Sequence, residues 1–105
     1  MKVEQFLNRN QFHLYGEVNG DIYHILQSYD SKVVEIREGE TILGRDWDYS
    51  TTTSKHVYEF LIDYSAAKDT DGESISYKLK HVKNKRKYVY ELINKGVIRY
   101  DEEMR

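Results

Sequence analysis

Hydrophobic and polar residues alternate through much of the first half of the chain, which is the spacing of half-buried β-strands. The alternation covers residues 12–15, 22–26, 32–38 and 41–49, with short polar connections between them. The first connection contains Asn19-Gly20, a dipeptide typical of two-residue hairpin turns with positive φ at glycine. The pattern therefore predicts a four-stranded antiparallel meander within residues 11–49.

The spacing of the hydrophobic residues changes to three and four after the hydroxyl-rich stretch at 50–54. Val57, Phe60, Leu61 and Tyr64 follow this spacing, so we expect a helix that covers one face of the sheet. Trp47 and Tyr49 end the last predicted strand. We expect these two side chains to be largely buried against Phe60 and Leu61.

Three further segments complete the predicted elements. A helical stripe from Lys85 ends at Gly96, a residue that favours the end of a helix. Residues 74–82 fit a strand and a helix equally well. Residues 2–9 carry apolar side chains at helical spacing and predict a short N-terminal helix. The fold class is therefore α+β: a four-stranded antiparallel meander followed by two helices, with a short N-terminal helix.

Composition limits the chain to one domain and excludes several kinds of site. Its 105 residues suit a single core, with the sheet at 11–49 and the helical part at 52–95. The sequence contains 10 tyrosines and no cysteine, which excludes disulfides and thiolate chemistry. The net charge is −2, and no apolar run is long enough for a membrane span. We expect a cytoplasmic protein.

Two segments resemble a known type of small protein. Gln27-Ser28-Tyr29-Asp30 and the segment WDYSTTTSKH at 47–56 are similar to a "QSY" turn and a "WDYS-x-TT-x-KH" motif in small proteins of phages and mobile elements of low-GC bacteria. An "FL" pair at 60–61 and ELINKGVI at 91–98 extend the resemblance. Such accessory proteins often inhibit host defences, including CRISPR systems, or regulate host enzymes. The resemblance therefore implies a cytoplasmic location in a host cell.

The hydroxyl-rich start of the first long helix is a candidate phosphate site. Thr52 and Thr53 offer hydroxyl groups, Lys55 and His56 offer cations, and the first turn of a helix offers free N–H groups. The alternative is that these side chains cap the helix and fix the corner between strand and helix. Capping is the commoner role of such residues.

A basic segment is the second candidate. Its members are Lys78, Lys80, Lys83, Lys85, Arg86 and Lys87, with Tyr88 beside them. Basic surfaces with aromatic side chains bind single-stranded nucleic acids. The alternative is a solvated face that balances the acidic loop at 69–73 and the acidic tail. The two interpretations stay open at this point.

Two pairs of residues are weaker candidates for a metal site. A two-residue turn at Asn19-Gly20 pairs Tyr15 with His24, which places His13 diagonally to His24 on one sheet face. Asp46 and Asp48 share one face of the last predicted strand. No third ligand occurs at a fixed spacing from either pair, so we expect no metal and no cofactor. Motifs of known catalytic sites are also lacking, and we expect no enzyme activity.

These observations predict an interaction protein of a phage or mobile element. We expect it to bind a host protein or ribonucleoprotein complex and to inhibit a host-defence or nucleic-acid-processing complex by occupying its surface. The alternative is a nucleic-acid-binding module that uses residues 78–87. The sequence fixes neither the target nor the oligomeric state.

Overall fold

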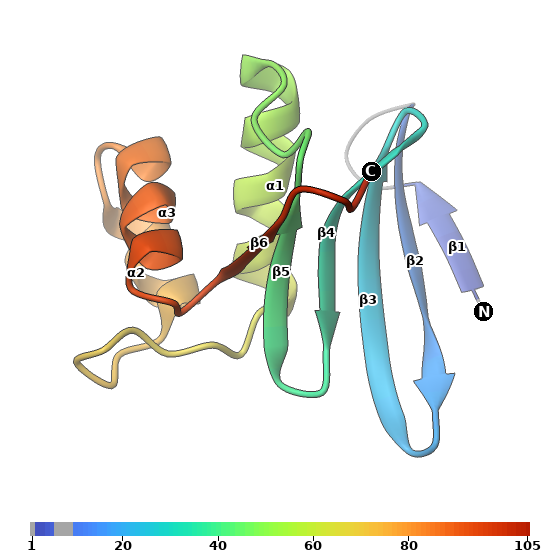
Figure 1. Cartoon of the computed structure of the whole chain (residues 1–105), viewed down its shortest axis with the longest axis horizontal. Helices are drawn as coiled ribbons and strands as arrows, with labels where there is room; N and C mark the ends of the chain where they lie inside the picture. Colours follow the sequence, from blue (N-terminus) through green and yellow to red (C-terminus); the bar gives the residue numbers. More distant parts are fainter. Residues whose placement is uncertain (1, 6–9) are drawn as a thin grey trace.

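The computed structural model describes residues 2–5 and 10–105, which form one six-stranded sheet and three helices (Figure 1). The strands are β1 (Lys2–Gln5), β2 (Gln11–Val18), β3 (Asp21–Ser28), β4 (Ser31–Arg37), β5 (Glu40–Gly44) and β6 (Arg99–Asp101). The helices are α1 (Thr51–Tyr64), α2 (Ile75–His81) and α3 (Lys85–Asn94). The α+β class predicted from the sequence is confirmed.

Neighbouring strands follow the order of the chain, and all pairs except β5–β6 are antiparallel. The Asn19-Gly20 turn is confirmed, with φ of 52° at Asn19 and 87° at Gly20. Tyr15 pairs with His24, as this turn requires. Because each hairpin connection holds only two residues, the meander from β2 to β5 is built almost entirely from local contacts.

The sheet has two strands more than the predicted four, one at each edge (Figure 1). Residues 2–5 form strand β1 and not the predicted helix, whereas positions 6–9 of that prediction lie outside the described residues. Val3 lies opposite Leu14 in this pairing. Pairing with β2 satisfies the backbone of both strands, whereas a helix of two turns is costly to nucleate. At the other edge, β6 returns after the helices and runs parallel to β5.

The last strand of the meander ends earlier than expected. Strand β5 stops at Gly44, and residues 45–49 form turns in which Trp47 N–H donates to the Gly44 carbonyl and Tyr49 N–H to that of Asp46. Aspartates at 46 and 48 favour turns over strands. Trp47 is buried as predicted, but the predicted burial of Tyr49 is wrong, because its side chain is 82% exposed.

Polar side chains cap all three helices. Ser50, Ser74 and Asn84 precede α1, α2 and α3, and each accepts a hydrogen bond from a backbone N–H in the first turn. The ambiguity at 74–82 is resolved in favour of a helix. Ser74 caps the first turn of α2, and this helix buries Ile75 and Leu79 on one face. Gly96 follows α3 with φ of 79°, as expected for a helix end.

One hydrophobic core joins the helices to one face of the sheet. Helix α1 contacts β3 and β4, and Figure 1 shows α2 and α3 beside it, toward the β6 edge. Trp47, Phe60 and Leu61 are each at most 1% exposed, which confirms their predicted burial. The opposite face of the sheet carries Tyr23, Ile25 and Glu35, which lie one residue out of step with buried Leu26 and Val34.

Candidate functional site

Three hydrogen bonds fix the β3–β4 turn, which contains the QSY segment. The Tyr29 N–H donates to the carbonyl of Asn10 (2.8 Å), and the Tyr29 carbonyl accepts from Gln27 Nε2 (3.0 Å). Ser28 is buried, and its Oγ accepts from Gln11 Nε2 (2.9 Å). The first two bonds hold the backbone of Tyr29 on both sides, so its conformation is imposed by its surroundings.

That conformation is unusual for an aromatic residue. Tyr29 has φ of 54°, in the left-handed region that glycine occupies readily. A side chain with a Cβ pays about 1–2 kcal/mol there. The tyrosine gains little burial at this position, because 62% of its surface is exposed. Folding energetics therefore give no reason for a tyrosine at this position, whereas an outward-facing aromatic ring suits binding.

A hollow of about 470 Å³ lies between this turn and the start of helix α1. We call it the tyrosine hollow, because Tyr29 and Tyr49 are its two exposed aromatic residues. It is lined by Ser28, Tyr29, Asp30, Ser31, Val33, Asp46, Tyr49, Ser50 and Thr53. The fold thus brings together the QSY and WDYS segments, although residues 31–46 separate them in the chain.

The tyrosine hollow is acidic. Asp30 and Asp46 both line it, and no Lys, Arg or His belongs to the described residues around it. Asp46 Oδ2 accepts a hydrogen bond from Ser31 Oγ (2.9 Å). No hydrogen bond or ion pair within the described part of the chain engages the Asp30 carboxylate. Two carboxylates in one hollow attract a cation and repel an anion.

Hydroxyl groups at the start of α1 are used within the helix itself. Ser50 Oγ accepts a hydrogen bond from the Thr53 N–H and donates one to Thr53 Oγ1, and both bonds are 3.1 Å long. Ser54 Oγ donates to the Ser50 carbonyl. Of the predicted phosphate-site residues, Thr52 and Lys55 are exposed, whereas Thr53 and His56 are buried. Ser50 and Ser54 thus bind groups of the first helical turn, which is the capping role named above as the alternative to a phosphate site.

His56 is poorly suited to hold an anion. Burial lowers the pKa of its imidazole, and the neighbouring Lys55 charge lowers it further. The ring is therefore neutral near pH 7 and supplies no positive charge. Only Thr53 of the predicted phosphate-site residues lines the tyrosine hollow, so the structure does not bring the four residues together at one open site.

The basic segment is partly neutralised by acidic residues of the same chain. Lys78 forms ion pairs with Asp69 (3.2 Å) and Asp71, and Arg86 pairs with Asp48 (3.2 Å). Lys80, Lys83, Lys85 and Lys87 have no carboxylate partner among the described residues. Lys85 instead donates to the carbonyl of Val82. Four of the six predicted cations thus stay available.

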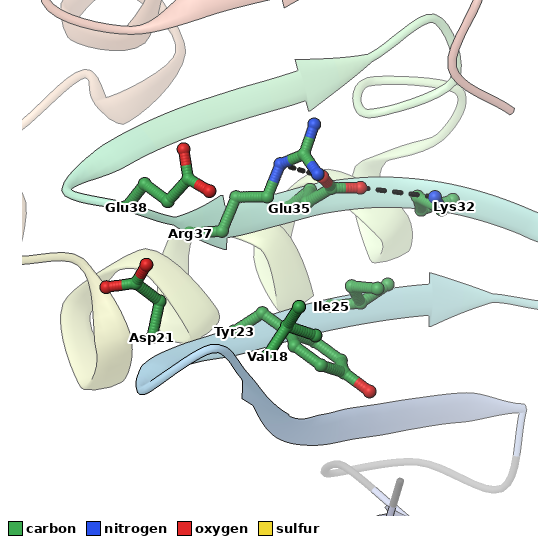
Figure 2. A pocket seen from close by; sticks show the side chains of 8 residues that line it. All are labelled: Val18, Asp21, Tyr23, Ile25, Lys32, Glu35, Arg37 and Glu38. Carbon is green, nitrogen blue, oxygen red and sulfur yellow. Dashed lines mark hydrogen bonds and ion pairs between the residues drawn. The ribbon is translucent and has the colours of Figure 1, made fainter.

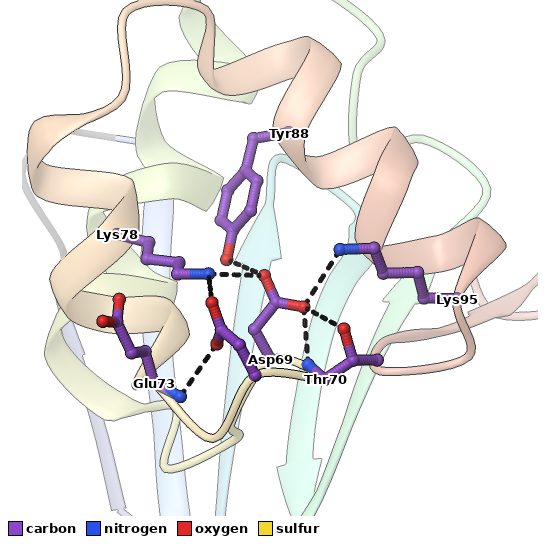
Figure 3. A network of polar contacts seen from close by, with 7 residues as sticks. Asp69, Thr70, Glu73, Lys78, Tyr88 and Lys95 are labelled. Atoms are coloured by element: carbon purple, nitrogen blue, oxygen red, sulfur yellow. Dashed lines mark hydrogen bonds and ion pairs between the residues drawn. The ribbon is translucent and has the colours of Figure 1, made fainter.

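Tyr88 points into a buried polar network and not toward solvent (Figure 3). Its hydroxyl donates a hydrogen bond to Asp69 Oδ2 (2.8 Å). Lys78 and Lys95 also donate to this carboxylate, and both of these bonds are 3.2 Å long. Asp69 is only 5% exposed. Burial alone raises the pKa of Asp69, but the hydrogen bonds from Tyr88, Thr70 N–H and the two lysines outweigh it and hold the pKa well below its usual value. The network joins the loop after α1 to α2 and α3.

A carboxylate and two imidazoles form a second polar chain on the helix-covered face. Glu4 Oε1 lies 3.0 Å from His13 Nδ1, and His13 Nε2 lies 2.8 Å from His24 Nδ1. The rings of Phe60 and Tyr64 pack on this pair from α1. Burial, followed by the His13 charge, lowers the pKa of His24. In the described part of the chain no three side chains are grouped as metal ligands.

The uncovered face of the sheet has its own hollow of about 350 Å³, shown in Figure 2. Glu35 lines it and is only 8% exposed. Arg37 Nε (2.7 Å) and Lys32 Nζ (3.1 Å) each bind one of its carboxylate oxygens. Both oxygens of the Glu35 carboxylate are therefore bound by cations of the same strand within this hollow.

Sequence reasoning missed Tyr29 and Asp30 and assigned Tyr49 to the core. The signal for the two tyrosines was present in the resemblance, since the QSY and WDYS segments contain Tyr29 and Tyr49. Asp46 was considered only for a cation site shared with Asp48. The structure separates that pair, because Asp46 lines the tyrosine hollow and Asp48 binds Arg86 and Tyr90.

Comparison with known proteins gives one family. None of the helices in the described residues is long and apolar enough to cross a bilayer. Neither the curated proteins nor the solved structures gave a match. A family model, described as a family of unknown function (DUF8033), matches residues 1–78, a stretch that includes the whole tyrosine hollow and ends before Lys80. Because the match spans well over half of the chain, the protein belongs to the DUF8033 family.

Proposed function

We propose that this chain is a binding protein that docks on a partner protein through the tyrosine hollow and acts by occupying the partner's surface. The observation that carries the proposal is Tyr29, an exposed aromatic residue held at φ of 54° by hydrogen bonds on both sides. A strained, outward-facing tyrosine has a cost in folding, and binding is the benefit that accounts for it.

The composition of the tyrosine hollow supports a protein partner. Tyrosine is enriched in the binding hot spots of protein interfaces, since its ring contributes a large contact area with few rotatable bonds. Tyr49 is 82% exposed, and it lines the same hollow as Tyr29. A hollow bordered by two such rings and two carboxylates has both apolar and charged anchors for a partner.

The resemblance to phage and mobile-element proteins suggests the class of partner. On that basis we propose a host-defence or nucleic-acid-processing complex as the target, which the chain inhibits without catalysis. The family match favours the tyrosine hollow as the docking surface. The matched residues 1–78 contain the whole hollow and exclude the lysines from Lys80 to Lys87.

The rival function is nucleic-acid binding through the basic segment. It is favoured by Lys80, Lys83, Lys85 and Lys87, four cations without a carboxylate partner among the described residues on α2, α3 and their connection. The pairing of Lys78 and Arg86 and the burial of Tyr88 reduce the cations and stacking rings left for this role.

An affinity-capture experiment separates the two functions. The tagged protein is incubated with lysate from a low-GC bacterium, with and without nuclease. We expect the captured partner to survive nuclease treatment, to be lost with Tyr29→Gly and Tyr49→Ala, and to be retained when Lys83, Lys85 and Lys87 are all changed to Glu.

Glu38→Gly is the matched control, because Glu38 also has positive φ, 51°, in a two-residue turn outside the hollow. Its capture should equal that of the unmodified protein. Loss of the partner on nuclease treatment, or with the triple lysine variant alone, would instead establish the nucleic-acid function.

A further inference from the structure

We infer that the tyrosine hollow binds the guanidinium group of an arginine side chain from the partner protein. This inference rests on the proposed docking function and specifies the chemistry of the contact. A hollow of about 470 Å³ falls within the size range of small-ligand sites and is large enough to admit one long side chain.

Charge is the first argument. Asp30 and Asp46 line the hollow, and no basic residue is found among its described lining residues. The Asp46 carboxylate uses Oδ2 for Ser31 and keeps Oδ1 for a further donor. The Asp30 carboxylate has no partner within the described ranges. A planar guanidinium has five N–H donors, which suits acceptors at more than one position.

The two aromatic rings are the second argument. Cations are attracted to the faces of tyrosine rings, and arginine is found there more often than lysine because its guanidinium is planar and weakly hydrated. Tyr29 and Tyr49 are 62% and 82% exposed, so their rings are accessible to such a group. A hydrated ammonium loses more solvation on entering the same space.

The chain already contains an arginine that contacts both an aspartate and a tyrosine, and this aspartate, Asp48, lies between the hollow residues Asp46 and Tyr49 in the sequence. The Arg86 guanidinium lies 5.6 Å from the centroid of the Tyr90 ring, and its Nη2 lies 3.2 Å from Asp48 Oδ2. An arginine, an aspartate and a tyrosine therefore form one contact beside Trp47. In the tyrosine hollow the aspartates and the tyrosines are present, and the arginine is the group that a partner would supply.

The start of α1 is the feature that opposes a cation. A helix N-terminus carries about half a positive charge, and Ser50 and Thr53 contribute to the lining. The Thr53 N–H is however already bound to Ser50 Oγ. Two full carboxylates exceed the remaining partial charge, so the net preference is for a cation.

The test is a titration followed by the backbone amide signals of the isotope-labelled full chain. The probe is N-acetyl-arginine methylamide, and the matched probe is the citrulline analogue, which has nearly the same shape without the charge. We expect saturable shifts at Tyr29, Tyr49 and Ser50 with a Kd in the millimolar range for arginine and at least about tenfold weaker binding for citrulline. The lysine analogue should bind several-fold more weakly than arginine.

Three variants complete the design. Asp46→Asn and Asp30→Asn should each weaken arginine binding, by about threefold to tenfold. Asp30 has no partner in the described structure, so this variant tests the site even if Asp46→Asn destabilises the turn. Asp21→Asn is the matched control, because Asp21 is an exposed acid that lines the hollow on the other sheet face.

Equal shifts with arginine and citrulline, equal affinity for lysine, or shifts confined to other surfaces would overturn the inference. So would preferential binding of inorganic phosphate at the same amides. If capture of the partner depends on Tyr29 while the arginine probe fails to bind, the docking function stands and the guanidinium contact is wrong. If the probe binds but capture is independent of Tyr29, the proposed function is wrong.

Discussion

The Tyr88 hydroxyl donates a hydrogen bond of 2.8 Å to Asp69 Oδ2 and so ties helix α3 to the loop that precedes α2 (Figure 3). Lys78 of α2 and Lys95, which follows α3, bind the same carboxylate. Because helices of 7 and 10 residues are short, they depend on such contacts to keep their place.

Replacing this carboxylate should therefore destabilise the fold. We expect Asp69→Asn to lower the free energy of unfolding by about 3 kcal/mol, since a buried charged acceptor bound by Thr70, Lys78, Tyr88 and Lys95 is lost. Chemical denaturation at neutral pH measures the change. Asp71→Asn is the control, because Asp71 shares Lys78 but is exposed, and an equal loss in both variants would contradict a special role for Asp69.

The effect of Asp69→Asn should also depend on pH. The folded state holds the pKa of Asp69 below its usual value of 3.8. A carboxyl group with a lowered pKa stabilises the fold above its unfolded pKa, and this contribution decreases as the pH falls through the unfolded pKa toward the folded one. The difference in stability between the two proteins should be constant from about pH 7 to pH 5 and shrink below about pH 4.

Tyr29→Gly should leave stability unchanged or raise it by up to about 1 kcal/mol, since glycine avoids the cost of a Cβ at positive φ. Thermal unfolding of this variant and of Glu38→Gly checks the prediction, because both residues have φ above 50°. A large loss of stability in Tyr29→Gly alone would show that the tyrosine contributes to folding, and would remove the main support for the docking site.

Substitution of a buried and of an exposed aromatic residue around α1 should change the stability of the fold to very different extents. Phe60 is fully buried, and Phe60→Ala should cost about 3–5 kcal/mol, enough to unfold much of a domain of this size. Tyr49→Ala should change the stability by less than about 0.5 kcal/mol, because its ring is 82% exposed. Denaturant titrations of the two variants provide the comparison, and similar values would contradict the observed packing.

His24 should make the fold sensitive to mild acid. Its pKa is lowered from 6.5 in the folded state, by burial and then by the charge of His13. A histidine with a lowered pKa binds protons more readily when unfolded, so its contribution is fully present above about pH 6.5 and declines as the pH falls. His24→Gln should therefore reduce the loss of stability between about pH 7 and pH 5.

The matched variant for this measurement is His81→Gln, since His81 is exposed on α2. Stability is determined by denaturation at several pH values in each protein. The same pH profile in His24→Gln and in the unmodified chain would show that the His13–His24 pair does not set the acid sensitivity.

Local patterns in the sequence predicted the elements that local forces determine. The Asn19-Gly20 turn, the stripe containing Phe60 and Leu61, and the end of α3 before Gly96 depend on neighbours within a few residues. Residues 74–82 stayed ambiguous because their apolar positions fit two periods. The Ser74 cap and burial against the core decide between them.

Contacts between residues distant in the sequence account for the places where the structure differs from the predicted elements. The helical spacing of residues 2–5 is overridden by pairing with β2, and Tyr49 leaves the core because β5 ends at Gly44. At Gly44 a Cβ would lie 2.5 Å from the Lys32 carbonyl oxygen and 2.7 Å from that of Met104, both distant in sequence. The tyrosine hollow likewise forms between two turns, so no single segment of the sequence reveals it.

Strand β6 has a consequence for how the chain folds. Each antiparallel hairpin from β2 to β5 closes a two-residue loop, whereas pairing of Ile42 with Arg99 must wait until both short helices have brought the chain back. Closing such a long loop is entropically costly, so we expect β6 to join the sheet last. Until then the β5 edge has unpaired backbone groups beside Ile42 and Leu43 and is open to pairing between chains. Pairing with Arg99–Asp101 then closes the β5 edge in the folded protein.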